Sequence, residues 1–240
     1  MVSNLLFRIE ERVFPPSIVG GSDHWVRQVM DRELASYIAG LRPDRLTALE
    51  VSGHGHQADG WLEYESWDYP DFDVCSDLAG DEPLFDVVLA EQVLEHVVDP
   101  VRALCNMAAL CRPGGLVIVT TPFLIKKHEI PKDYWRFTED GIRLLLERVG
   151  LAEEVVSSWG NRYVVVGNFN RWTRRMPWHT LRNEPNFPVV VWAIGRKPLM
   201  KKGEAGESNA VSAEDGIATG GQGLKSDTVS YLGAGEPTRN

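Results

Sequence analysis

Apolar residues predominate in three short runs in the middle of the chain, at 46–51, 85–90 and 116–120. Each run is short and is bounded by turn residues. Runs that are apolar at successive positions are typical of strands buried on both faces of a parallel sheet. A later apolar run at 189–194 predicts one more strand, which would close the sheet.

Outside these runs the apolar residues follow a helical period. The pattern predicts a helix over 24–39, capped by Ser22-Asp23, and a second helix over about 100–110. Thr138 can cap a third helix, which Gly150 would end because glycine readily adopts the left-handed conformation at a helix C-terminus.

Alternating strands and helices predict an α/β fold with a single doubly wound, mostly parallel, Rossmann-like sheet and right-handed crossovers. The first crossover is abbreviated. A second strand is expected at about 61–68, so 56–60 leave room only for a turn or loop, whereas a parallel crossover commonly takes a dozen or more residues.

The composition divides the chain into three parts. Residues 1–44 are predicted to be an N-terminal extension with a helix, and 45–200 the α/β domain. Residues 201–240 are rich in Gly, Ser, Ala, Thr and charged residues, and they contain few apolar ones. Such a segment buries too little apolar surface to offset its ordering entropy, so we expect a disordered tail.

Charge and composition narrow the class of protein. With a net charge of −9, the chain lacks the excess of Lys and Arg that non-specific nucleic-acid binding needs. We see no apolar stretch long enough to span a bilayer and no signal peptide, so we expect a cytoplasmic protein. The three cysteines show neither metal-ligand spacing nor the even number of a disulfide framework.

The candidate chemistry begins at the end of the first apolar run, where Gly53 and Gly55 let the main chain turn sharply and approach a ligand. Further landmarks follow this glycine motif along the chain. In order, the motif and the later landmarks are Glu50-Val51-Ser52-Gly53-His54-Gly55, Asp68, Asp77-Leu78 after a third candidate strand, Glu91, Glu95-His96 and Arg112-Pro113-Gly114-Gly115.

In this order the landmarks resemble the class I S-adenosylmethionine-dependent methyltransferases, over roughly 45–155. The resemblance implies a seven-stranded type of sheet whose last strand is antiparallel. It also implies a cofactor site beyond the carboxyl ends of the strands. The implied cofactor-binding residues are Glu50, Gly53, Gly55, Asp68, Asp77, Leu78 and Glu91.

The resemblance gives these residues separate roles. The backbone at Gly53 and Gly55 would pass under the methionine part of S-adenosyl-L-methionine, and Asp68 would accept both ribose hydroxyls. Asp77-Leu78 would meet the adenine, and Glu91 and Gln92 would flank the methionine and sulfonium region. Asp68 and Asp77 are also compatible with solvated turns, and His96 with a structural role.

We predict no metal site. His54 and His56 are close in sequence, but two histidines without a third or fourth ligand are too few for a typical zinc site.

The acceptor side is expected in the irregular polar and aromatic segment 121–138. His128 is the predicted general base because an unperturbed imidazole titrates near neutral pH, with Glu129 and Asp133 as rivals. The segment resembles His-x-x-Pro-x-Asp-Tyr-Trp-Arg-Phe-Thr loops of bacterial methyltransferases of glycan pathways. Tyr134, Trp135 and Arg136 are the predicted substrate-binding residues, although the aromatic rings could merely cover the sheet edge. The basic, aromatic segment 171–175 could complete the acceptor cleft, or contact a subunit or an anionic surface.

The sequence therefore predicts a methyltransferase that uses S-adenosylmethionine, most consistent with O-methylation of a sugar or glycan hydroxyl. The partner would be a small-molecule or oligosaccharide acceptor, and a homodimer stays open. N- or C-methylation of another metabolite is the alternative, as is a catalytically silent partner protein. An NAD-dependent oxidoreductase is disfavoured because Gly-x-Gly-x-x-Gly is absent.

Overall fold

A computed structural model describes residues 24–128, 132–169 and 171–199. The expected tail at 201–240 and the expected cap at Ser22-Asp23 lie outside these residues. The helices are α2 (Gln28–Gly40), α3 (Pro100–Leu110), α4 (Glu139–Arg148) and α5 (Arg162–Gly167), and the 3-10 turns are η2 (Trp25–Arg27), η3 (Pro43–Arg45) and η4 (Gln57–Asp59). The strands are β1 (Thr47–Val51), β2 (Glu63–Trp67), β3 (Phe85–Glu91), β4 (Cys111–Pro122), β5 (Ala152–Trp159) and β6 (Val190–Arg196).

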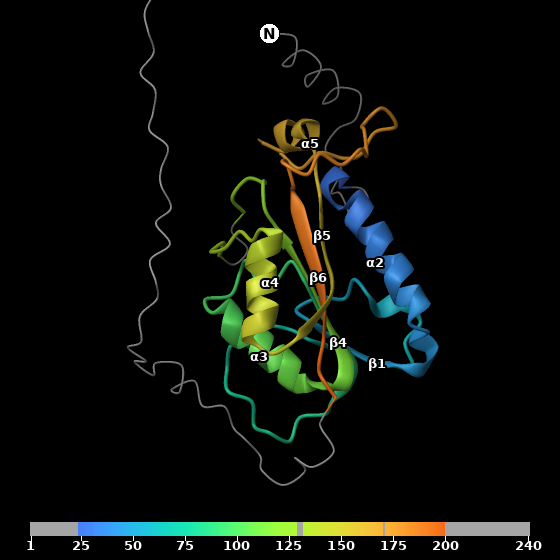
Figure 1. Ribbon diagram of the computed structural model, residues 1–240, viewed down its shortest axis with the longest axis vertical. Coiled ribbons are helices and arrows are strands. Elements are labelled where there is room, and N and C mark those ends of the chain that lie inside the picture. The colour runs from blue at the N-terminus through green and yellow to red at the C-terminus, as the bar shows by residue number, and fades with distance from the viewer. Residues whose placement is uncertain (1–23, 129–131, 170, 200–240) are drawn as a thin grey trace, which may run out of the picture. The chain divides into compact units, whose positions relative to one another are not determined.

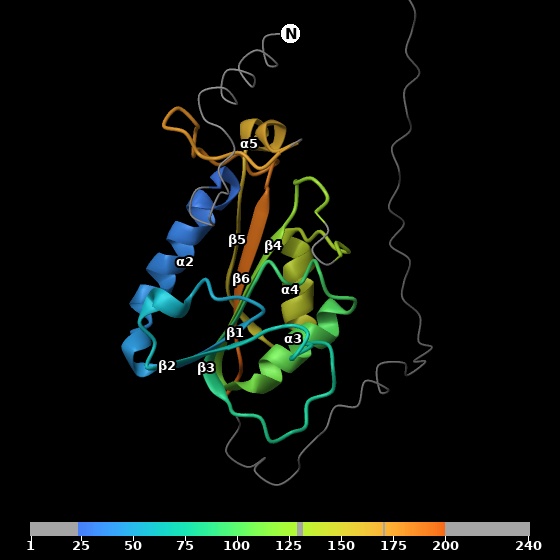
Figure 2. The same ribbon diagram turned by 180° about the vertical axis from the view of Figure 1, so that it is seen from behind.

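The strands form one sheet in the order β2-β1-β3-β4-β6-β5. The first four pair in parallel, and β6 is antiparallel to both of its neighbours. The predicted Rossmann-like α/β class and the antiparallel last strand are therefore confirmed. In Figures 1 and 2, α2 covers one face of the sheet, while α3 and α4 cover the other.

Two expectations about the strands meet different outcomes. The prediction of a third strand before Asp77 is wrong, because the described segment 68–84 contains no strand. Among the described residues, the sheet has six strands. The many Asp residues of segment 68–84, with Pro70 and Pro83, disfavour a strand because these residue types fit the pleated surface poorly. The abbreviated first crossover is confirmed, since η4 is the only helical turn between β1 and β2.

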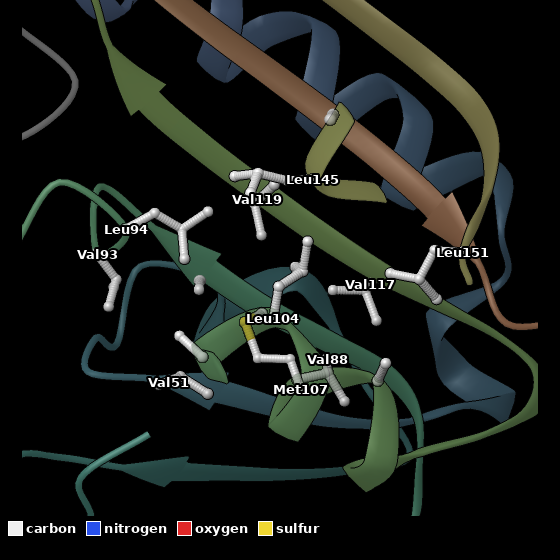
Figure 3. Close-up of a cluster of buried hydrophobic side chains, with 14 of the residues drawn as sticks. Val51, Val88, Val93, Leu94, Leu104, Met107, Val117, Val119, Leu145 and Leu151 are labelled. Carbon is white, nitrogen blue, oxygen red and sulfur yellow. The ribbon is translucent and has the colours of Figure 1, made fainter. Parts of the chain in front are cut away.

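Side chains of the central strands alternate between two apolar cores, as the period of a strand requires. Figure 3 shows the core beneath α3 and α4, where Val88 of β3 and Val117 and Val119 of β4 meet Leu104 and Leu145. The intervening strand residues point to the opposite core under α2. Both faces of the sheet are thus buried, which explains the apolar runs.

The Arg112-Pro113-Gly114-Gly115 segment forms the entry of β4. The register moves from Phe85↔Cys111 to Val87↔Leu116, so the extra residues bulge out of the strand. Gly114 has a φ of +82°, and a Cβ on Gly115 would lie 2.6 Å from the carbonyl oxygen of Asp86. The glycines thus allow a tight entry into the buried strand.

Among the described residues, no helix has the length and apolar character needed to cross a membrane.

Gly160 joins β5 to α5 at a point of close backbone approach. A Cβ there would lie 2.0 Å from the Phe187 carbonyl oxygen and 2.6 Å from the Val189 amide nitrogen. Because these are backbone atoms, we expect Gly160→Ala to destabilise the fold by about 3 kcal/mol or more. Gly40→Ala is the control, since its Cβ would meet nothing within 4 Å. Urea unfolding measures both changes, and equal stabilities would contradict this packing.

Candidate functional site

The loop after β1 is built on the buried carboxylate of Glu50, whose exposure is 1%. Oε1 of Glu50 accepts a hydrogen bond from the Gly55 amide at 2.9 Å, and Oε2 accepts one from the His56 amide at 2.8 Å. The hydroxyl of Tyr64, on β2, donates to Oε2 at 2.7 Å. Burial and the neighbouring Glu50 carboxylate raise the pKa of Tyr64. These bonds fix the loop against β1 and β2.

The two predicted loop glycines lie where a side chain would crowd a carboxylate. A Cβ on Gly53 would be 2.7 Å from Oε1 of Glu50, and one on Gly55 would be 3.2 Å from Oε2 of Glu91. Glu91 stands at the end of β3 and accepts a hydrogen bond from Arg27. The structure therefore brings Glu50, Gly53, Gly55 and Glu91 together at the carboxyl edge of the sheet.

The other predicted cofactor residues lie around this loop. Asp68 follows β2, and its half-exposed carboxylate lies 3.0 Å from Nε2 of His54, within the loop. Leu78 packs in part against the core beneath α3 and α4. Asp77 is 93% exposed and pairs with Arg102 of α3, so its carboxylate is engaged away from the loop.

A cavity of about 220 Å³ lies at the same edge of the sheet. It is bounded by the ends of β3 and β4, the start of β6, the η2 turn and the loop that carries His128. Its lining residues are His24, Val26, Arg27, Gln92, Pro122, Ile125, His128, Trp172, Val189 and Val190.

Arg27 connects this cavity to the loop after β1. Its guanidinium lines the cavity, pairs with Glu91 and lies 3.2 Å from Oδ1 of Asp31. Burial alone would lower the pKa of Arg27, but the two carboxylates outweigh it and raise the pKa. The cavity and the loop therefore share a charged wall.

His128 is the predicted catalytic residue that reaches the cavity. Its ring meets Trp172 edge-on, with the ring centroids 5.7 Å apart. Its Nδ1 lies 3.5 Å from Oδ2 of Asp133. Burial lowers the pKa of His128, which favours the neutral imidazole that a general base requires. Its rival Glu129 lies outside the described residues.

Asp133 holds the His128 loop together. Its side chain is 2% exposed, its Oδ2 accepts a hydrogen bond from the His128 amide at 2.8 Å, and both oxygens accept bonds from Arg136. Burial raises the pKa of Asp133, but the Arg136 guanidinium and the His128 amide together lower it to about 2. Asp133 is thus a paired carboxylate that does not line the cavity.

The three predicted substrate-binding residues also lie away from the cavity lining. Tyr134 and Trp135 are 45% and 40% exposed, and their amides donate to the Glu95 carbonyl oxygen. The Trp135 indole donates to the Val97 carbonyl oxygen at 2.9 Å. These bonds tie the segment to 95–97, and neither aromatic ring lines the cavity.

Sequence reasoning missed Arg27, which lines the cavity. Two other lining residues, Gln92 and Trp172, fall in segments that the sequence analysis had singled out. Gln92 directly follows β3, with a φ of +57°. No local pattern connects Arg27 with this edge.

Comparison with known proteins gives a family match. Residues 18–154 match the family model described as "Methyltransferase domain". The chain is 35% identical over 94 residues to the ubiquinone biosynthesis O-methyltransferase of Alkalilimnicola ehrlichii. This match covers 39% of this chain and 34% of that protein. It is 29% identical over 90 residues to the protein of the same name from Rhodopseudomonas palustris, covering 37% and 32%. The chain thus matches about a third of the length of these relatives.

Among solved structures, the chain is similar to the 1,6-didemethyltoxoflavin-N1-methyltransferase of Burkholderia thailandensis with bound S-adenosylhomocysteine. The identity is 16%, the match covers 74% of this chain and 84% of that one, and the TM-score is 0.43.

The Asp133 ion pair predicts an acid-dependent stability. The pKa of the Asp133 carboxyl group is lower in the folded than in the unfolded state. The stability that the ion pair contributes is therefore present above the unfolded-state pKa, and it is lost as the pH falls through the folded-state value of about 2. Wild type should exceed Asp133→Asn in stability by about 2 kcal/mol near neutral pH, and this difference should shrink below about pH 4. Urea unfolding from pH 7 to 3 measures it. Asp81→Asn, at an exposed position, is the control, and a pH-independent difference would contradict the ion-pair origin.

Proposed function

The chain belongs to the methyltransferase-domain family, and from this premise we propose that it transfers a methyl group to a hydroxyl oxygen of a one-ring acceptor. The cofactor is S-adenosylmethionine, which supplies an electrophilic methyl group on a sulfonium. One observation carries the proposal. The cavity that contains His128 shares the Arg27–Glu91 wall with the glycine loop after β1.

The residues at this edge fit the cofactor. Side chains on Gly53 and Gly55 would crowd carboxylates, so the loop offers bare backbone for a close approach. Asp68 has a half-exposed carboxylate beside this loop, with two acceptor oxygens for a ribose diol. The partly buried Leu78 offers an apolar contact for an adenine ring.

The size and lining of the cavity restrict the acceptor. Its volume of about 220 Å³ is below the roughly 300–1,000 Å³ of pockets for drug-sized ligands. One ring therefore fits, or one unit of a larger molecule. Most of the lining is apolar, with Val26, Pro122, Ile125, Val189 and Val190 contributing. Such a lining favours a phenolic ring, in agreement with relatives named ubiquinone biosynthesis O-methyltransferase.

A sugar or glycan hydroxyl is the second candidate acceptor. Tyr134, Trp135 and Arg136, on which this hypothesis was based, lie outside the cavity lining. Trp172 and the polar side chains of Gln92 and His24 nevertheless lie on the lining. An indole can pack on the apolar face of a pyranose while polar groups bind its hydroxyls.

Methyl transfer to oxygen requires an in-line attack and the loss of a proton. The acceptor oxygen forms a bond to the methyl carbon as the carbon–sulfur bond breaks, and the sulfur leaves as a neutral thioether. We assign the departing proton to the imidazole of His128, the predicted base on the cavity wall. Asp133, already bound by Arg136, positions the loop that carries this imidazole.

Cofactor binding provides the first test. Asp68→Ala should weaken the binding of S-adenosylmethionine by roughly 1.5–3 kcal/mol, the range for hydrogen bonds to a charged group. Calorimetry on the folded variant measures the change, and Asp71→Ala, at an exposed position of the same segment, should bind as wild type does. Equal affinities of all three proteins would remove Asp68 from the cofactor site.

Activity provides the second test. Transfer of labelled methyl groups should be followed with a panel of phenols, mono- and oligosaccharides and amines, and the products mapped. We expect an O-methyl product, and we expect His128→Ala to lower turnover about 100-fold while cofactor affinity is retained. An N- or C-methyl product would contradict the assigned oxygen acceptor. Cofactor binding without transfer to any acceptor would favour a silent partner protein.

A further inference from the structure

Glu95 carries a buried carboxyl group that lacks hydrogen-bond donors among the described residues. It is 0% exposed, and within the described part of the chain neither Oε1 nor Oε2 has a hydrogen-bond partner. Burial raises the pKa of Glu95 to about 8. Its main-chain carbonyl oxygen accepts bonds from the Tyr134 and Trp135 amides, so the residue is firmly placed. Buried carboxyl groups in proteins are normally hydrogen-bonded, paired or bound to a metal ion.

Two imidazoles face the same oxygen of this carboxyl group. Nε2 of His96 lies 3.8 Å from Oε1 of Glu95, and Nε2 of His128 lies 3.9 Å from it. These separations are too long for hydrogen bonds. The three ligand atoms lie within 4.8 Å of one another. Two ligands about 2.1 Å from a tetrahedral ion stand roughly 3.4 Å apart, so small side-chain rotations would complete the site.

The opposite nitrogen of each ring faces an acceptor. Nδ1 of His96 contacts the Lys132 carbonyl oxygen, and Nδ1 of His128 lies 3.5 Å from Oδ2 of Asp133. Histidines that bind metals usually donate their second ring N–H to a carbonyl or a carboxylate, which leaves the other nitrogen free to coordinate. The contact with Lys132 therefore holds the His96 ring in the orientation of a ligand. Nδ1 of His128 faces the Asp133 carboxylate without a hydrogen bond.

A second group with suitable ligand atoms differs in one decisive respect. Glu50, His56 and Glu91 also lie close together among the described residues. However, the loop amides and Tyr64 saturate the carboxylate of Glu50, and Arg27 pairs with Glu91. The charge of that group is compensated, whereas the oxygens of Glu95 have no such donors in the described part of the chain.

We propose that Glu95, His96 and His128 bind one divalent transition-metal ion, with zinc as the best fit. Two imidazoles and one carboxylate suit zinc, whereas magnesium prefers oxygen ligands throughout. Three protein ligands leave a coordination position open, and His128 places the site at the wall of the cavity.

The chemical consequence rests on the proposed function, although metal binding itself does not. In the metal-free chain, His128 keeps its lone pair and takes the acceptor proton directly. In the loaded chain, that lone pair holds the ion, which would increase the acidity of an acceptor hydroxyl in the open position. The proton of this hydroxyl would then pass to solvent.

Metal titration of the full chain, freed of metal by a chelator, tests the site. Zn²⁺ should bind with one equivalent in calorimetry, and Co²⁺ should give the visible absorption of a four- or five-coordinate site. Glu95→Gln and His128→Ala should each weaken binding at least 10-fold. Glu153→Gln makes the same chemical change at the opposite end of the sheet and should bind as wild type does.

Thermal unfolding provides an independent readout that also reveals a variant that fails to fold. Zn²⁺ should raise the melting temperature of wild type and of Glu153→Gln, but not that of a folded Glu95→Gln or His128→Ala. Absence of binding in wild type, or wild-type binding by both cluster variants, would overturn the site. Methyl transfer without ion binding would refute the metal site alone, and ion binding without methyl transfer to any acceptor would refute the proposed function alone.

Discussion

The ligand-binding edge of the sheet depends on how the buried carboxylate of Glu50 is compensated. Strand β1 carries this charge into the interior, where an unpaired carboxylate would cost several kcal/mol. Two amides of the following loop and the hydroxyl of Tyr64 supply the required donors. The loop must therefore fold back over Glu50, and this path leaves room for glycine alone at position 53.

Hydrogen bonds between the loop and β2 take the place of a first crossover helix. The hydroxyl of Ser66 donates to the Gly53 carbonyl oxygen at 2.6 Å, and Asp68 lies beside His54. Together with Tyr64, these residues fix the loop from the second strand as well as from the first. A chain with only the η4 turn between β1 and β2 can thus keep a defined loop. The short crossover is compatible with a working cofactor site.

The sequence predicted those parts of the fold that depend on local patterns. Apolar runs identified β1, β3, β4 and β6. Thr138 identified the start of α4, and in the structure its hydroxyl accepts a hydrogen bond from the Gly141 amide. The cavity could not be predicted in the same way. Arg27 and Trp172 reach it from segments far apart in the chain, and their meeting depends on tertiary packing, which no local period records.

Two glutamates are buried at this edge, and the contrast between them separates structure from chemistry. Glu50 has donors on both carboxylate oxygens, so its charge serves to organise a loop. Glu95 has none among the described residues, although a glutamine or an apolar residue of similar size would avoid the cost of burying a carboxyl group. Two imidazole nitrogens lie 3.8 and 3.9 Å from its Oε1 and leave a space between ligands that a cation would fill. The carboxyl group of Glu95 therefore fits a role in binding, whereas Glu50 already fulfils a structural one.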